Sequence, residues 1–235
     1  IAWYDNIPLF SYLVLLRGKC RHCSGHISWR YPAIELLTAV LFVAVWYLYG
    51  LTETPQGYTA MIMNPAIPVY WLVVFGLLMG TFIDLEHMII PDRVSLGGIV
   101  IGLIASALIP SLHQSDTMLQ SLIRSGMGIL AGSGSLMLIA VLGKMAFKKD
   151  AMGMGDVKLL GAIGAFFGWQ GVLFTIITSS FIGSAVGVGL ILAGKKEWQG
   201  RMPFGPCLAV GAMWWMLGGD ALWYAYLRWV SGGAI

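Results

Sequence analysis

Long apolar runs fill most of the chain, and short polar segments separate them. A helix needs about 20 mostly apolar residues to cross a membrane. Runs of this character cover residues 33–50, 66–83, 94–109, 122–146, 157–168, 172–193 and 205–217. The strands of a membrane barrel would alternate apolar and polar residues, which these runs do not. The pattern therefore predicts an all-α, polytopic membrane bundle with about seven transmembrane helices.

The two ends of the chain depart from this pattern. Residues 1–32 are more polar, so we predict a small cytoplasmic module there and a transmembrane domain over 33–235. The run at 221–230 is apolar and aromatic but only ten residues long, too short for a span. We expect it to lie at the membrane interface or to extend the preceding helix. The chain starts at Ile1 without the features of a signal peptide, so we expect a preceding segment.

Composition excludes an ordinary soluble domain. The chain of 235 residues is 58% hydrophobic and 11% charged, whereas soluble domains average about 25% charged residues. So much apolar surface is incompatible with a water-soluble globule of this size and with disorder. The 31 glycines and 10 tryptophans fit membrane helices and their interfaces. The lipid bilayer is therefore the expected surrounding, and nucleic acid is not an expected partner.

Basic residues gather in alternate loops. If seven helices alternate across the membrane, one side receives 12 of the 14 lysines and arginines: Arg17, Lys19, Arg21, Arg30, Arg93, Lys144, Lys148, Lys149, Lys158, Lys195, Lys196 and Arg201. The opposite loops, 51–65 and 110–121, contain none. Loops rich in lysine and arginine stay in the cytoplasm, so we predict that this side is cytoplasmic.

Two aspartates are the strongest candidates for chemistry. Asp84 ends a helix in GTFIDLEHMIIPD, and Asp156 begins one in GMGDVKLLGA, both on the predicted cytoplasmic side. Two nearby carboxyl groups share a proton, so one activates water while the other acts as an acid, as in aspartic proteases. Gly153 and Gly155 would let a substrate strand approach the backbone. The residues alone leave open that Asp156 is a helix cap and Asp84 part of a solvated turn.

Five longer segments, two of which contain the aspartates, resemble a known family. They are WYDNIPLFSYLVLLRGKCRHC at 3–23, ISWRYPAIELLTA at 27–39, FIDLEHMIIPD at 82–92, GMGDVKLLGAIGAFFGW at 153–169 and MPFGPCLAVG at 202–211. In this order they resemble the type IV prepilin peptidases, bacterial membrane aspartic proteases of the GxGD kind.

The resemblance implies a function and a catalytic pair. Asp84 and Asp156 would be catalytic. The enzyme would remove the basic leader of type IV prepilins or type II secretion pseudopilins, after a glycine and just ahead of a hydrophobic helix. Cleavage would take place on the cytoplasmic side of the inner membrane. The freed amine would then be methylated with S-adenosylmethionine.

Other polar residues accompany the pair. Glu86 and Asp92 either attract the basic leader or simply solvate the loop. Lys158 either influences Asp156 or extends to the interface. With Gly153 and Gly155, these residues are the candidate substrate-binding set.

Cys20 and Cys23 have the spacing of half a structural zinc site, which needs two further ligands. The longer family members carry a second CxxC pair upstream, so zinc depends on that pair or on substitutes such as His22 and His26. Gly18 and Lys19, beside the cysteines, are the candidate methyltransferase positions.

Two rival functions remain from the residues alone. The first is a small transporter or channel, although transporters place polar sites near the midplane and this chain places its charges at one interface. The second is a structural membrane component of a secretion apparatus, in which the acidic residues have no chemical role.

Overall fold

The computed structural model describes residues 10–15, 18–53, 59–61, 64–148, 152–194 and 203–232. Five of the basic residues used above to predict orientation lie outside them: Arg17, Lys149, Lys195, Lys196 and Arg201. The chain divides into two compact units, Ile1–Ile67 and Pro68–Ile235.

Helix α1, Arg30–Gly50, is the longest element among the described residues of the first unit. A short π-helical turn, Ser11–Leu15, precedes it. Strand β1, Leu51–Glu53, then pairs antiparallel with β2, Thr59–Met61. This ladder is absent from the all-α prediction, because three-residue strands are too short for an alternating pattern to be recognised. The helical class is otherwise confirmed over the described residues.

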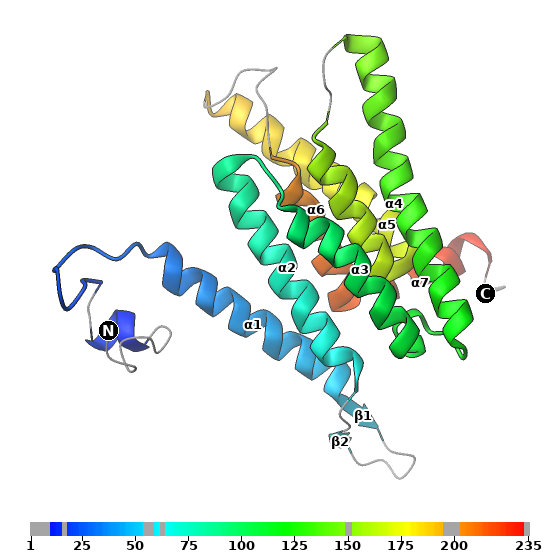
Figure 1. Ribbon diagram of the computed structural model, residues 1–235, viewed down its shortest axis with the longest axis horizontal. Helices are drawn as coiled ribbons and strands as arrows, with labels where there is room; N and C mark the ends of the chain where they lie inside the picture. The colour runs from blue at the N-terminus through cyan, green and yellow to red at the C-terminus, as the bar shows by residue number, and fades with distance from the viewer. Residues whose placement is uncertain are drawn as a thin grey trace. The chain divides into compact units, whose positions relative to one another are not determined.

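Helices build the second unit (Figure 1). In chain order they are α2 (Ala66–His87), α3 (Asp92–Leu108), the 3-10 turn η3 (Pro110–His113), α4 (Met118–Phe147), α5 (Met154–Leu192), α6 (Gly205–Trp214), the π-helical turn η4 (Trp215–Gly219) and α7 (Asp220–Val230). The first α2 residues complete the preceding unit.

Helix α5 is a hairpin of two limbs. Gly168 interrupts its helical geometry with φ 67° and ψ −175°. A methyl group on Gly164 would lie 3.0 Å from Cγ2 of Val172, although eight residues of straight helix span about 12 Å. The chain therefore folds back at Gly168. The limbs, 154–167 and 169–192, correspond to the two helices predicted over this region.

Close backbone approach joins α4 to the first limb of α5. A methyl group on Gly128 would overlap the carbonyl group of Gly164, and one on Gly164 would overlap the carbonyl of Gly128. Helix α3 also lies against this limb, where Gly102 faces Ala165. Small residues at membrane helix interfaces allow such approach. They fix the first limb between α3 and α4.

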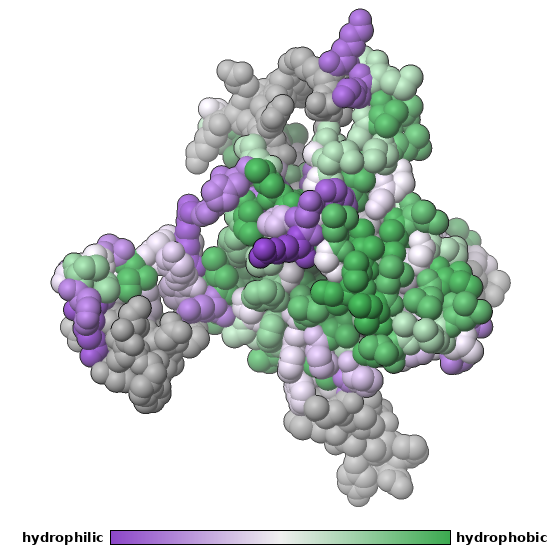
Figure 2. Space-filling view, viewed as in Figure 1, coloured by the Kyte–Doolittle hydropathy of each residue, from purple (hydrophilic) through white to green (hydrophobic). Residues whose placement is uncertain are grey.

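Over the residues that the structure describes, four helices are long and apolar enough to cross a membrane: α1, α2, α4 and α5. The sequence predicts seven spans. The difference arises because α5 contains two predicted helices, α3 has 17 residues and α6 has ten before the π-helical turn. Many large apolar side chains are exposed, including Leu130 at 75% and Phe181 at 74%. Figure 2 shows broad hydrophobic areas on the visible face. A multi-pass membrane protein explains both features.

Candidate active site

Asp84 lies in the last turn of α2 and is 5% exposed. Its Oδ2 accepts a hydrogen bond of 3.1 Å from the backbone N–H of Gly205, at the start of α6. These residues are 121 positions apart in the chain. The N-terminus of a helix carries partial positive charge, so α6 favours a carboxylate at this position. The solvated turn considered for Asp84 is therefore not what the structure contains.

Asp156 lies in the first turn of α5 and is 9% exposed. Gly153 occupies the N-cap position of this helix, and a methyl group there would lie 3.4 Å from Oδ2 of Asp156. The charge of Asp84 acts on Asp156. The structure thus brings together two buried carboxyl groups from helices that are distant in sequence.

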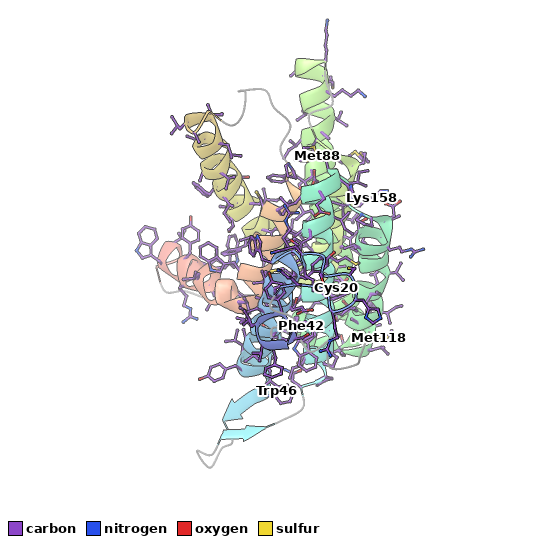
Figure 3. All side chains as sticks on the ribbon, turned by 90° about the vertical axis from the view of Figure 1, so that its left-hand side faces the viewer. Cys20, Phe42, Trp46, Met88, Met118 and Lys158 are labelled. Atoms are coloured by element: carbon purple, nitrogen blue, oxygen red, sulfur yellow. The ribbon has the colours of Figure 1, made fainter. Side chains whose placement is uncertain are left out.

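Ile90 connects the elements of the site. It lies between α2 and α3 and is 7% exposed. A methyl group on Gly155 would lie 3.1 Å from its Cβ, and one on Gly205 would lie 3.0 Å from its Cδ1. The starts of α5 and α6 therefore meet the end of α2 around one apolar side chain. Figure 3 shows Met88 and Lys158 near this end of the second unit, and Met118 near the other.

Gly205 is the site residue that sequence reasoning missed. Its segment, MPFGPCLAVG at 202–211, contributed to the family resemblance, but none of its residues was a predicted site residue. A methyl group at Gly205 would lie 2.6 Å from Oδ2 of Asp84. The signal in the sequence was a glycine between two prolines at a helix start, which identifies a helix boundary but not its partner.

The other predicted polar residues, Lys158, Asp92 and Glu86, are more exposed than Asp84 and Asp156. Nζ of Lys158 lies 2.7 Å from Oδ1 of Asp92, with side-chain exposures of 33% and 64%. Lys158 is two residues after Asp156, so the two side chains project from different faces of the helix. The lysine consequently contacts Asp92 of α3. Glu86, two residues after Asp84, is exposed.

The cysteine segment forms a tight turn in the first unit. Lys19 and His26 form an antiparallel bridge. Cys20 donates its N–H to the carbonyl of Gly25 at 2.8 Å, and its own carbonyl accepts from Ser24 at 2.9 Å. Cys20 is half-buried and Cys23 is exposed. Within the described ranges, no three histidine, cysteine or acidic side chains converge as metal ligands.

Gly18 has a local structural role. Its φ is +74°, which favours glycine, and its carbonyl accepts a hydrogen bond of 2.8 Å from Ile27. Together with the bridge at Lys19, this bond closes the base of the cysteine turn. Neither contact identifies a cofactor site.

The arrangement of Asp84 and Asp156 suits hydrolysis. Two interacting, buried carboxyl groups favour a singly protonated pair, in which one group accepts a proton while its partner donates one. This chemistry needs only water as co-substrate.

Comparison with known proteins agrees with this chemistry. The model of the Type IV leader peptidase family matches residues 71–188, which include both aspartates, and the model of the Bacterial Peptidase A24 N-terminal domain matches residues 1–49. No solved structure matches significantly.

Curated relatives cover nearly the whole chain, and each is named prepilin leader peptidase/N-methyltransferase. The relative from Aeromonas hydrophila is 37% identical over 95% of this chain and 71% of its own length. The relative from Xanthomonas campestris is 34% identical over 97% of this chain and 72% of its own length. The relative from Neisseria gonorrhoeae is 35% identical over 98% of this chain and 71% of its own length. The resemblance drawn from the five sequence segments is confirmed, and the chain belongs to the type IV leader peptidase family, a family of peptidases.

Proposed function

We propose that the chain is a prepilin leader peptidase in which Asp84 and Asp156 are the catalytic pair. The observation that carries this proposal is the burial of two interacting carboxyl groups at one end of the second unit. The substrates are type IV prepilins or type II secretion pseudopilins, cut after a glycine that precedes their hydrophobic helix. The family match to peptidases favours this function over a transporter, a channel or a scaffold.

In the proposed reaction, the ionised carboxylate takes a proton from water while the water oxygen attacks the scissile carbonyl carbon. The protonated carboxyl group gives its proton to the carbonyl oxygen. The tetrahedral intermediate then collapses and the carbon–nitrogen bond breaks: the leaving nitrogen receives a proton from the first carboxyl group, and a hydroxyl group of the intermediate returns a proton to the second, which restores the singly protonated pair. The products are a leader with a free carboxylate and a mature protein with a free amine.

The surroundings of the pair support roles in substrate binding. Gly153 is exposed and leaves space beside Asp156 for the backbone of the leader, whereas Gly155 allows the start of α5 to pack against Ile90. The exposed carboxylates of Glu86 and Asp92 attract its basic residues, and Lys158 holds Asp92 in place. Attraction between exposed charges is weak and falls with salt, so these residues contribute to capture rather than to chemistry.

The proposed topology places the pair at the cytoplasmic face of the inner membrane. Seven spans are proposed, with each limb of α5 counted separately and the first limb crossing only in part. Its 14 residues, 154–167, extend about 21 Å, less than the thickness of the apolar core. Residues 1–32 are proposed as the cytoplasmic module and 33–235 as the peptidase domain.

Methylation of the new amine is the second proposed activity, because the relatives carry N-methyltransferase in their names. S-adenosylmethionine would supply the methyl group. The described contacts of Gly18 and Lys19 fit a structural role, so no methylation step is derived from them. Cys20 and Cys23 supply two of the four ligands that a structural zinc ion needs. No step of the mechanism uses zinc.

Intact-mass measurement of a prepilin tests both activities. Wild-type enzyme in membranes should remove the leader, and with S-adenosylmethionine the product should gain one methyl group. Asp84→Asn and Asp156→Asn should each abolish cleavage. Asp116→Asn, at an exposed loop position, is the matched control and should cleave normally. Full cleavage by either active-site variant would contradict the catalytic pair.

A further inference from the structure

An apolar groove of about 160 Å³ lies between α2, α3 and the first limb of α5. Its inner wall includes the buried side chains of Val73, Leu77 and Ile163. Its outer rim includes Phe75 and Met79, which are 53% and 38% exposed. The groove therefore opens sideways from the helical unit, at positions of a helix that is long and apolar enough to cross a membrane.

The groove follows the helical faces that carry the two aspartates. Leu77 and Val73 precede Asp84 by seven and eleven residues, and Ile163 follows Asp156 by seven. Such spacings return a side chain to nearly the same face of a helix. Both walls of the groove consequently continue from the two carboxyl groups toward the membrane interior.

The distance between the groove and Asp84 follows from the positions of the lining residues along α2. Its α2 wall runs from Leu72 to Met79, which are 12 and five residues before Asp84. With a rise of 1.5 Å per residue, the wall lies about 8 to 18 Å below Asp84. A helix that starts at the scissile bond and runs alongside α2 would place its residues about 5 to 12 in the groove.

We propose that this groove binds the apolar segment of the substrate that follows the scissile bond. The inference rests on the proposed function and assigns to it a specificity site within the membrane. The basic leader does not fit the groove, because its one charged lining residue is Arg93, which would repel it. Apolar side chains from one face of a substrate helix do fit, and their insertion into the groove would bring the preceding peptide bond to Asp84 and Asp156.

Filling the groove tests this assignment. Gly76 lines it, and a methyl group there would meet only Cγ1 of Val94, at an ordinary 3.9 Å. A leucine at this position projects into the groove. Gly134→Leu is the matched control, because Gly134 on α4 is exposed and has open space around it.

The readout is KM and kcat for two substrates, a complete prepilin and a peptide truncated about four residues after the scissile bond, short of the groove. Gly76→Leu should raise KM for the prepilin about tenfold, a change of about 1.4 kcal/mol in binding, with kcat preserved. The truncated peptide should be unaffected, and Gly134→Leu should alter neither substrate. Equal KM values for Gly76→Leu and wild type would overturn the assignment. Failure of the wild type to cleave would instead overturn the proposed function.

Cross-linking gives a second test that does not depend on the folding of Gly76→Leu. A photoreactive phenylalanine replaces Phe75 in the Asp84→Asn background, so that the prepilin stays uncut. We expect adducts to prepilin residues about 5 to 12 after the scissile bond. The same probe at Leu130, 75% exposed on α4, should give none. Adducts at position 75 only to lipid or to α1 of the enzyme would contradict the proposal.

Discussion

At the scale of single residues, Gly205 is the position where the site has least space. Its backbone N–H holds Oδ2 of Asp84, and the missing side chain leaves room for that same oxygen. The residue is a positioning residue, since it acts through Asp84.

Gly205→Ala should therefore displace the carboxyl group of Asp84. The added methyl group would lie 2.6 Å from Oδ2 and 3.0 Å from Cδ1 of Ile90. A displacement of about 1 Å at a reacting group costs on the order of a hundredfold, so we expect this loss in kcat. Gly134→Ala, where nothing lies within 4 Å, is the control. Unchanged kcat in a folded Gly205→Ala enzyme would exclude the positioning role.

His113 gives a second prediction at this scale. It is 7% exposed, and its Nε2 lies 2.9 Å from Oγ of Ser106 and 3.1 Å from the carbonyl of Ala165. Because that carbonyl can only accept, Nε2–H of the imidazole donates to it. Burial lowers the pKa of His113 below its ordinary 6.5. The hydrogen bond to Ala165 partly opposes this shift, and the charge of Arg124 adds to it.

The folded protein therefore binds fewer protons at His113 than the unfolded chain does. Its contribution to stability is complete above the ordinary pKa and is lost as the pH falls below about 6.5 toward the lower folded value. In detergent, the Tm of the wild type should fall over this range, and that of His113→Gln should fall less. Identical dependence of Tm on pH for the wild type and His113→Gln would show that His113 does not contribute to the pH dependence of stability.

At the scale of elements, the break at Gly168 makes two helices out of α5. The combination of φ 67° and ψ −175° belongs to a region that is essentially restricted to glycine. The break leaves backbone carbonyls at the end of the first limb without helical partners. The carbonyl oxygen of Ala165 accepts hydrogen bonds from Nε2 of His113 and, at 2.9 Å, from Oγ of Ser125.

Gly168→Ala should lower stability by about 1 to 3 kcal/mol, the usual cost of such a backbone conformation. Space does not limit the substitution, since a methyl group there would lie 3.6 Å from Nδ1 of His113. Gly126→Ala, in the interior of α4 with nothing within 4 Å, should be neutral or slightly stabilising. Thermal unfolding in detergent compares the two. Equal Tm values for both variants would show that the break carries no backbone strain.

The sequence predicted the helices well because apolar length is a local property. The runs at 33–50, 66–83 and 94–109 each begin and end within four residues of a helix in the structure. The β1–β2 ladder was missed because strand pairing in three-residue segments leaves no pattern.

The same reasoning found Asp84 and Asp156 but could not find their surroundings. Polar residues at the ends of apolar runs are visible in one sequence. The bond from Gly205 to Asp84, the contact of Lys158 with Asp92 and the groove below the pair depend on helix packing. Residues 66 to 121 positions apart meet there, and no local pattern records which ones.

At the scale of the whole molecule, the second unit has its two buried carboxyl groups at helix ends and its apolar groove along the length of the helices. Its charged residues around the α2–α3 junction form a hydrophilic area beside a broad hydrophobic surface (Figure 2). The two carboxyl groups lie buried in the last turn of α2 and the first turn of α5, and the apolar groove lies along these helices and α3. A substrate that is basic on one side of its scissile bond and apolar on the other matches both surfaces.

The central claim is that Asp84 and Asp156 act as one catalytic unit. The most direct test is kcat for prepilin cleavage by Asp84→Asn, Asp156→Asn and the double variant. Groups that act together are strongly non-additive, so each single substitution should lower kcat by at least about 10⁴-fold and the double variant should be no slower than either. Cleavage within about tenfold of wild type by one single variant, or losses that multiply in the double variant, would contradict the claim.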